Sequence, residues 1–211
     1  MASGTPVEHA GGPEGVNPFW SDPADKGKNM DALEDQIEAY EKVMPEQYQL
    51  LFALAKSDNR NSAVFVLDTS KSVSDEDCIL TFWLVNEPAH RAATLQKRGE
   101  TENGQAIVIP VNSLEKMYLG CRVNDEGGKP MISIAAFDEA NLDVLPEFEL
   151  VRSAGQFWVR TMSLGDKAAR VDRAYVQMCK GATRRVDNLT IYGTTMEDED
   201  VARVFTNEEV A

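Results

Sequence analysis

The spacing of apolar side chains changes near residue 45. Before that point they recur at intervals of three and four residues, which predicts an amphipathic helix over residues 29–44 with Asn29 as its N-cap. Pro45 disfavours a helical backbone at the residue before it, so we expect the helix to stop there. The apolar stripe of this helix consists of Met30, Leu33, Ile37, Tyr40 and Met44.

After residue 50 the pattern is that of short strands. Apolar runs rich in β-branched and aromatic residues alternate with clusters of Gly, Asn, Asp, Ser and Pro, which favour turns. A short helix is expected at residues 88–98, with Pro88 in its first turn. We expect strands at residues 50–55, 63–68, 78–85, 106–111, 116–123, 131–137, 148–152, 156–162, 169–178 and 187–192.

These short, closely spaced strands indicate the fold class. They favour a mainly β protein, an antiparallel sandwich or barrel of about 8–10 short strands with one or two peripheral helices, over alternating β-α units. The turn at residues 125–130 predicts a hairpin between the strands on either side of it, and residues 153–155 predict a second.

The pattern divides the chain into four segments. Residues 1–28, rich in Gly, Pro and small polar side chains, form an arm that cannot bury enough apolar surface to order itself. The amphipathic helix follows at 29–44, the β-rich domain at 50–205 and an acidic tail at 206–211. The run of carboxylates at 197–200 is assigned to the solvated end of the chain.

Charge and targeting signals narrow the classes of partner. The formal net charge is −14, from 35 acidic and 21 basic side chains, so nucleic acid and anionic bilayers are not the expected partners. No basic segment followed by an apolar core opens the chain, and no apolar run is long enough to span a bilayer. The three cysteines are too far apart for a disulfide framework or a metal knuckle. We therefore expect an intracellular, cytoplasmic protein with no membrane insertion.

The motifs of common enzymes are missing from the sequence. It contains no phosphate-binding Gly-rich loop, no H-E-x-x-H and no G-x-S-x-G, and its histidines are His9 and His90. The acidic residues before Cys78 oppose a thiolate there, so a Cys78–His90 nucleophile is not expected. We expect no catalytic residue, no metal and no cofactor, although an active site assembled from distant residues stays open.

A stretch near the start of the β-rich domain carries a family resemblance. It comprises Leu51-Phe52, the turn at 56–61, Val64-Phe65 and Phe82-Trp83-Leu84. This pattern resembles the opening of the uncharacterised DUF4833 family, in which an LFxIxRSxNxNxVVY segment precedes a strand that ends in Trp. The resemblance spans roughly residues 50–205 and departs from the family at residues 88–111. It implies one β-rich domain and no known activity.

Two functions from different classes follow. The first is a non-catalytic structural or protein-interaction subunit of a larger assembly, attached through its arm and helix. Its partner-binding residues would be Phe19, Trp20, Leu33, Ile37 and Tyr40. The alternative for the helix stripe is packing on the chain's own sheet.

The second function is a small apolar-ligand carrier with a β-barrel pocket. The walls of that pocket would be Phe82, Trp83, Phe157, Trp158 and Tyr175.

Overall fold

A computed structural model describes residues 33–57, 59–138, 142–165, 167–178 and 186–207. Its first described element is a helix over residues 33–41, called the N-terminal helix below. The other helices are α2 (Pro88–Arg98), α3 (Ser113–Leu119) and α4 (Ala135–Asp138). The strands are β1 (Tyr48–Lys56), β2 (Asn59–Asp68), β3 (Ile79–Leu84), β4 (Val108–Pro110), β5 (Cys121–Glu126), β6 (Lys129–Ile134), β7 (Phe148–Ser153), β8 (Gln156–Thr161), β9 (Ala169–Met178), β10 (Val186–Thr195) and β11 (Asp200–Thr206).

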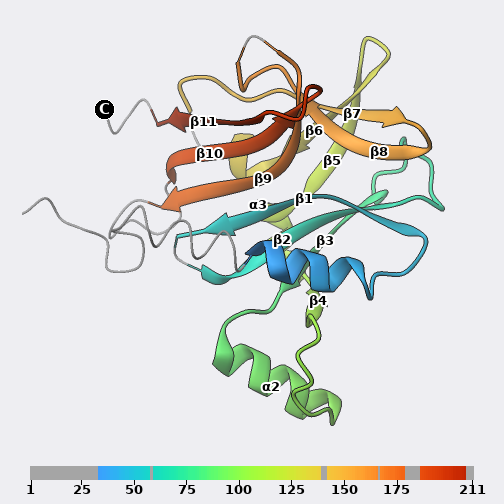
Figure 1. The fold of residues 1–211 in the computed structure, drawn as a ribbon, viewed down its shortest axis with the longest axis vertical. Coiled ribbons are helices and arrows are strands. Elements are labelled where there is room, and N and C mark those ends of the chain that lie inside the picture. The colour runs from blue at the N-terminus through green and yellow to red at the C-terminus, as the bar shows by residue number, and fades with distance from the viewer. Residues whose placement is uncertain (1–32, 58, 139–141, 166, 179–185, 208–211) are drawn as a thin grey trace, which may run out of the picture.

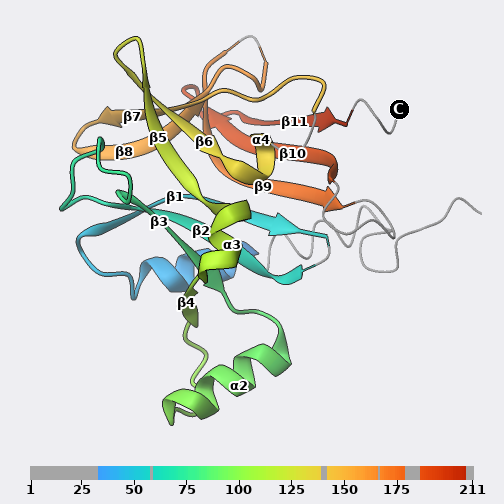
Figure 2. The ribbon, with the colours of Figure 1, turned by 180° about the vertical axis from the view of Figure 1, so that it is seen from behind.

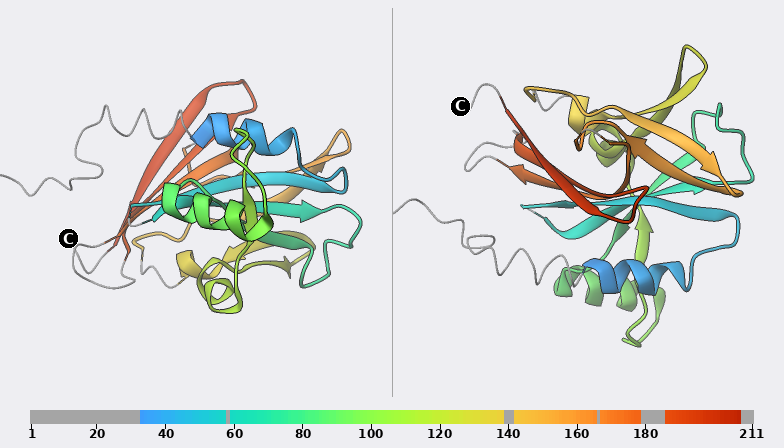
Figure 3. Two further views of the ribbon diagram at one scale, coloured as in Figure 1. Left: turned by 90° about the horizontal axis from the view of Figure 1, so that it is seen from below. Right: turned by 45° about the horizontal axis from the view of Figure 1, so that its top comes forward.

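The strands form one sheet that curls into a half-barrel (Figures 1 and 3). Its order is β4-β3-β2-β1-β9-β8-β7-β6-β5, and β10 and β11 continue from the other side of β9. The mainly β class is confirmed. One pair departs from the expected antiparallel pattern, because β1 and β9 run parallel through residues 53–56 and 173–176.

Strand β9 makes three pairings, and two of them share one edge. Its first residues pair with β8, where Arg170 lies opposite Arg160, and its later residues pair with β1. Its other edge pairs with β10 along nearly its whole length. Strands β1 and β8 therefore separate from the same edge of β9, and we call the place where they separate the fork.

The sheet buries apolar side chains on both faces of β1 and β2. The larger cluster fills the concave side of the half-barrel, and Phe65 and Leu67 of β2 belong to it. A register shift in β1 between Leu50 and Phe52 turns both Leu51 and Phe52 into this cluster. Such a bulge changes which residues share a face, so a strict alternation cannot hold along this strand.

The N-terminal helix covers the outer face of β1–β3 (Figures 1 and 3). Leu33 and Tyr40 are buried there, and Ile37 and Met44 pack beside them. The predicted stripe is thus used by the chain's own sheet, which was the alternative to partner binding for Leu33, Ile37 and Tyr40. Phe19, Trp20 and Met30 lie outside the described residues.

Asn61 holds the start of α2 on the sheet. Its side-chain oxygen accepts hydrogen bonds from the backbone N–H groups of Asn86 and Glu87, at 2.9 and 3.0 Å. Its amide nitrogen lies 2.9 Å from Nδ1 of His90. The helix then extends away from the sheet and ends at Gly99, whose φ of 69° is easiest for glycine (Figure 2).

Three segments differ from the sequence expectation. Residues 135–137, expected in the strand at 131–137, belong to α4. Residues 116–119, expected in a strand, belong to α3, because Asn112 and Glu115 form a reciprocal capping box that starts a helix there. Residues 197–200 were assigned to the acidic end, but 197–199 lie in the turn from β10 into β11 and Asp200 begins β11, which was not predicted. Of the predicted acidic tail, residues 208–211 lie outside the described residues.

The burial of Tyr40 predicts a pH effect on stability. Burial, with a smaller contribution from Tyr48, raises the pKa of the Tyr40 phenol from 10.0 to about 12. The unfolded chain therefore loses this proton first, and the protein should lose stability as the pH rises from about 10 to about 12. Urea unfolding across this range should show a smaller loss for Tyr40→Phe. An equal loss in both proteins would contradict the packing of the helix on the sheet.

Candidate functional site

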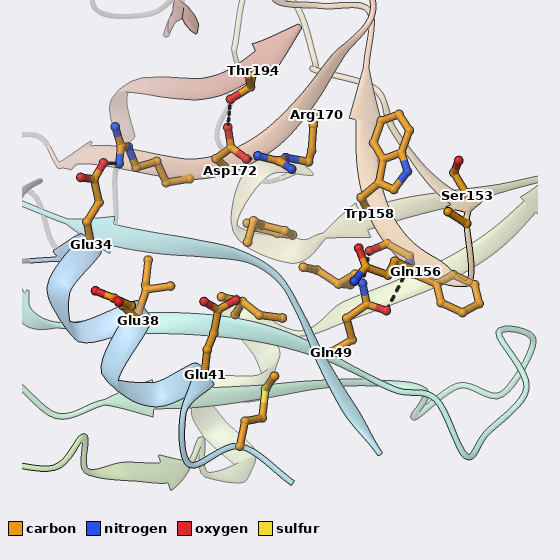
Figure 4. A pocket seen from close by; sticks show the side chains of 18 of the residues that line it. Glu34, Glu38, Glu41, Gln49, Ser153, Gln156, Trp158, Arg170, Asp172 and Thr194 are labelled. Carbon is orange, nitrogen blue, oxygen red and sulfur yellow. Dashed lines mark hydrogen bonds and ion pairs between the residues drawn. The ribbon is translucent and has the colours of Figure 1, made fainter. Parts of the chain in front are cut away.

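The fork opens into a cleft between the N-terminal helix and the ends of β8, β9 and β10 (Figure 4). Its volume is about 780 Å³, within the range of small-molecule sites. The helix forms one wall, and β1 forms the floor. The opposite side is formed by β8 with the turn before it and by the residues of β9 and β10 that face the helix.

Gln49 of β1 closes the base of the fork. Its side-chain amide donates to the carbonyl oxygen of Phe157 at 2.5 Å, and its side-chain oxygen accepts from the N–H of Phe157 at 2.9 Å. The amide thus replaces the neighbouring strand that Phe157 lacks at this point. One side chain satisfies a donor and an acceptor that would otherwise lie unpaired between two separating strands.

The helix wall of the cleft is acidic. Glu34, Glu38 and Glu41 lie four and three residues apart, so they share one face of the helix and point toward the cleft in Figure 4. Glu34 forms an ion pair with Arg173, and Glu38 pairs with Lys42 at 3.1 Å. Glu41 makes no ion pair with any described residue. It is the carboxylate of this wall most available to a ligand.

The β9–β10 wall contains a fixed polar group. Asp172 accepts from Nε of Arg170 at 2.7 Å and from the Thr194 hydroxyl at 2.6 Å. Arg173 lies over the ring of Tyr192 at 5.5 Å and has a buried Nε with no hydrogen-bond partner in the described chain. Together with Asp198, the cleft has five carboxylates against two guanidinium groups among its described lining residues, so its local charge is negative.

The strand β8 side adds apolar surface. Phe157 and Trp158 line the cleft, with Tyr48 and Met44 on the side of the helix and β1. Past Gln49 a second hollow of about 660 Å³ continues along the other side of the Gln49–Phe157 bridge. That hollow carries basic groups, Lys71 and Arg152, and Arg152 lies 5.2 Å above the Phe157 ring.

The five residues expected to line a barrel pocket do not gather around one cavity. Trp83 belongs to the packed core of the half-barrel, and Phe82 lies on the outer face near the N-terminal helix. Tyr175 is buried on β9, and its hydroxyl group donates to Gln177 at 3.2 Å. Phe157 and Trp158 both line the fork cleft, and Phe157 also packs against the core of the half-barrel.

The described thiols and the described imidazole are held within the fold. Burial raises the pKa of the Cys121 thiol, and it is the main cause of the raised pKa of Cys78, whose Sγ donates to the Val73 carbonyl. His90 is held by Asn61, so Cys78 and His90 are engaged separately. Within the described ranges no three His, Cys, Asp or Glu side chains gather as metal ligands, and no described helix has the length and hydropathy to cross a membrane.

The acidic wall and Gln49 were not identified from the sequence. The spacing of Glu34, Glu38 and Glu41 was a usable signal, because it marks a second stripe on the helix beside the apolar one. Nothing marks Gln49, since its partner is 108 residues away. Comparisons of the chain with known protein families, with curated proteins and with solved structures each found no match.

The Gln49 bridge should stabilise the fork measurably. Gln49→Ala leaves the N–H and carbonyl of Phe157 without their partner and should lower the free energy of unfolding by about 1–3 kcal/mol. Gln49→Glu keeps an acceptor but loses the donor, so an intermediate loss is expected. Gln96→Ala, on the exposed side of α2, is the control and should change stability little. Urea unfolding measures all three, and a Gln49→Ala protein as stable as the wild type would contradict the role assigned to the bridge.

Proposed function

We propose that this chain is a non-catalytic protein-interaction subunit that holds a basic segment of a partner protein in the fork cleft. The observation that carries the proposal is the pairing of an acidic helix wall with an aromatic wall in one open cleft. The attachment surface is then the polar face of the N-terminal helix, whereas its apolar stripe serves the fold. Membership of DUF4833 and a place in a larger assembly belong to the same proposal.

The two walls contribute in different ways. Exposed carboxylates add only about 0.2–1 kcal/mol each in ion pairs, so they mainly select a basic partner and speed its approach. Aromatic rings such as Trp158 and Phe157 supply the buried apolar area from which interfaces gain most affinity. A segment that combines lysine or arginine with apolar side chains can form ion pairs with the acidic wall and apolar contacts with the aromatic wall. Phe19 and Trp20 remain predicted partner-binding residues, and they would form a second contact with the partner.

A small-ligand carrier is the second candidate, and the cleft volume of about 780 Å³ favours it. Its binding site would be the fork cleft rather than a barrel lumen. A ligand of this kind would contact Phe157 and Trp158 and would not depend on Glu41. Binding of uncharged aromatic compounds that survives charge reversal at Glu41 would favour this function over the first.

A charge reversal in the cleft tests the proposal. Glu41→Lys removes one attraction and adds a repulsion of similar size, so it should weaken binding of a labelled peptide of alternating lysine and leucine by up to about tenfold, a loss of ~1.4 kcal/mol, measured by fluorescence anisotropy. Asp35→Lys makes a similar change on the same helix outside the cleft lining and should leave binding nearly unchanged. Equal weakening by both variants would show attraction to the overall charge of −14 and would overturn the proposal.

Trp158→Ala gives the complementary measurement with the same peptide. It should weaken binding by a similar factor and should leave the salt dependence of binding intact, because it removes apolar contact and no charge. Binding that is insensitive to Trp158 would place the peptide elsewhere on the protein.

A further inference from the structure

Strand β11 ends one side of the sheet and pairs with β10 (Figures 1 and 2). The register of this pair runs without a shift from Asp200 opposite Thr194 to Thr206 opposite Asn188. Because no bulge interrupts it, the direction of each backbone group along β11 follows a strict alternation.

Hydrogen bonds at both ends of β11 define that alternation. On the β10 side, the N–H of Asn207 donates to the Asp187 carbonyl at 3.0 Å. On the same side the carbonyl of Glu199 accepts from the N–H of Thr195 at 2.9 Å. The carbonyl of Thr206 accepts from the N–H of Asp143 on the opposite side, at 2.8 Å. Odd-numbered residues therefore direct their backbone groups to β10, and even-numbered residues direct theirs outward. Asp143 occupies the outward groups of Thr206.

The outward groups of Asp200, Ala202 and Val204 have no strand beside them in the described structure. The other two ends of the sheet are protected. Strand β4 has three residues and includes Pro110, and Arg98 donates to the carbonyl of its first residue. Strand β5 exposes charged and polar side chains along most of its length. Over residues 200–204 strand β11 has no proline, and its exposed charges there are Asp200 and Arg203.

Exposed apolar side chains lie on β11 and on segments hydrogen-bonded to it. Val204 is 55% exposed, and Val144, Leu145 and Met162 are 47, 52 and 58% exposed. Hydrogen bonds join their segments: Asp143 to Thr206, Glu147 to Ser163 and Arg203 to Ser163. These side chains therefore lie on neighbouring segments beside β11. An apolar area next to an unpaired strand is the usual composition of a surface that another strand covers.

We propose that a second copy of this chain adds its own β11, antiparallel, to this edge. The three outward residues are symmetric about Ala202. An inverted copy thus places Ala202 opposite Ala202 and Asp200 opposite Val204 twice, which uses every open backbone group. No acidic side chain then faces another. A two-fold contact of this kind uses the same surface on both copies and closes after two chains.

The contact ends where the chain covers its own edge. Asp143 already bonds to the outward backbone groups of Thr206, and Leu142 forms an isolated β-bridge with Asn207. A partner strand therefore cannot pair with β11 past Val204. An edge of this length matches an identical edge and leaves a longer foreign strand partly unpaired. The apolar side chains Val144 and Leu145 lie at that end and can cover the turn of the second copy.

A proline at the centre of the edge tests this contact. Ala202→Pro removes an N–H that points outward and leaves the ladder to β10 intact, so the domain should stay folded. Ala202→Thr keeps the N–H and is the matched control. Sedimentation equilibrium at tens of micromolar should show dimers for the wild type and Ala202→Thr, and monomers for Ala202→Pro. A monomeric wild type, or a dimeric Ala202→Pro, would overturn the proposal.

Cysteine cross-linking tests the register and does not depend on proline being tolerated. Under a mild oxidant Ala202→Cys should give a disulfide-linked dimer, because the Cα atoms of two residues in a hydrogen-bonded antiparallel pair lie about 5.5 Å apart, within disulfide range. Asp200→Cys is the control, since the two copies of residue 200 lie opposite residue 204 and are too distant to join. Cross-linking of Asp200→Cys as efficient as that of Ala202→Cys would overturn the proposed register.

Val204→Lys should also dissociate the dimer, because lysine on an edge strand opposes pairing.

Discussion

The parallel pairing of β1 with β9 is the interaction on which the rest of the structure depends. It joins the layer formed by β1–β4 and the N-terminal helix to the layer formed by β5–β11. Ser57 extends the pairing, because its N–H donates to the Val176 carbonyl at 3.0 Å and its hydroxyl oxygen accepts from the N–H of Met178 at 2.9 Å. The strands are more than 100 residues apart in sequence. Since loop closure must precede such a contact, we expect slow folding.

The fork follows directly from this pairing. Strand β9 has one edge for two neighbours, so β1 and β8 share it and then diverge. Divergence exposes backbone groups between them, and Gln49 satisfies the pair on Phe157. The space that remains is the cleft. Its walls are polar where the helix faces it and apolar where β8 does, so one topological constraint produces both the opening and its mixed chemistry.

Both proposed surfaces lie where strand pairing stops. At the fork a strand edge is divided between two neighbours, and at β11 the edge has no neighbour over residues 200–204. The cleft faces the N-terminal helix and the open edge lies beyond β10, and a hollow of about 420 Å³ lined by Glu34, Arg173 and Ala202 connects the two surfaces. A subunit with one symmetric contact and one acidic cleft would present two copies of the cleft per dimer.

Local features of this protein were determined by the sequence alone. Apolar periodicity and turn chemistry act within about ten residues, and they predicted α2, the hairpins β5–β6 and β7–β8, and the apolar stripe of the N-terminal helix. They failed for α3, where the Asn112–Glu115 capping box outweighed an apolar run, and for β11, which follows an acidic turn. Only the tertiary structure decided the parallel pair, the role of Gln49 and the open edge. Each depends on groups that meet after the sheet has curled, and their separation in sequence leaves no periodic signal.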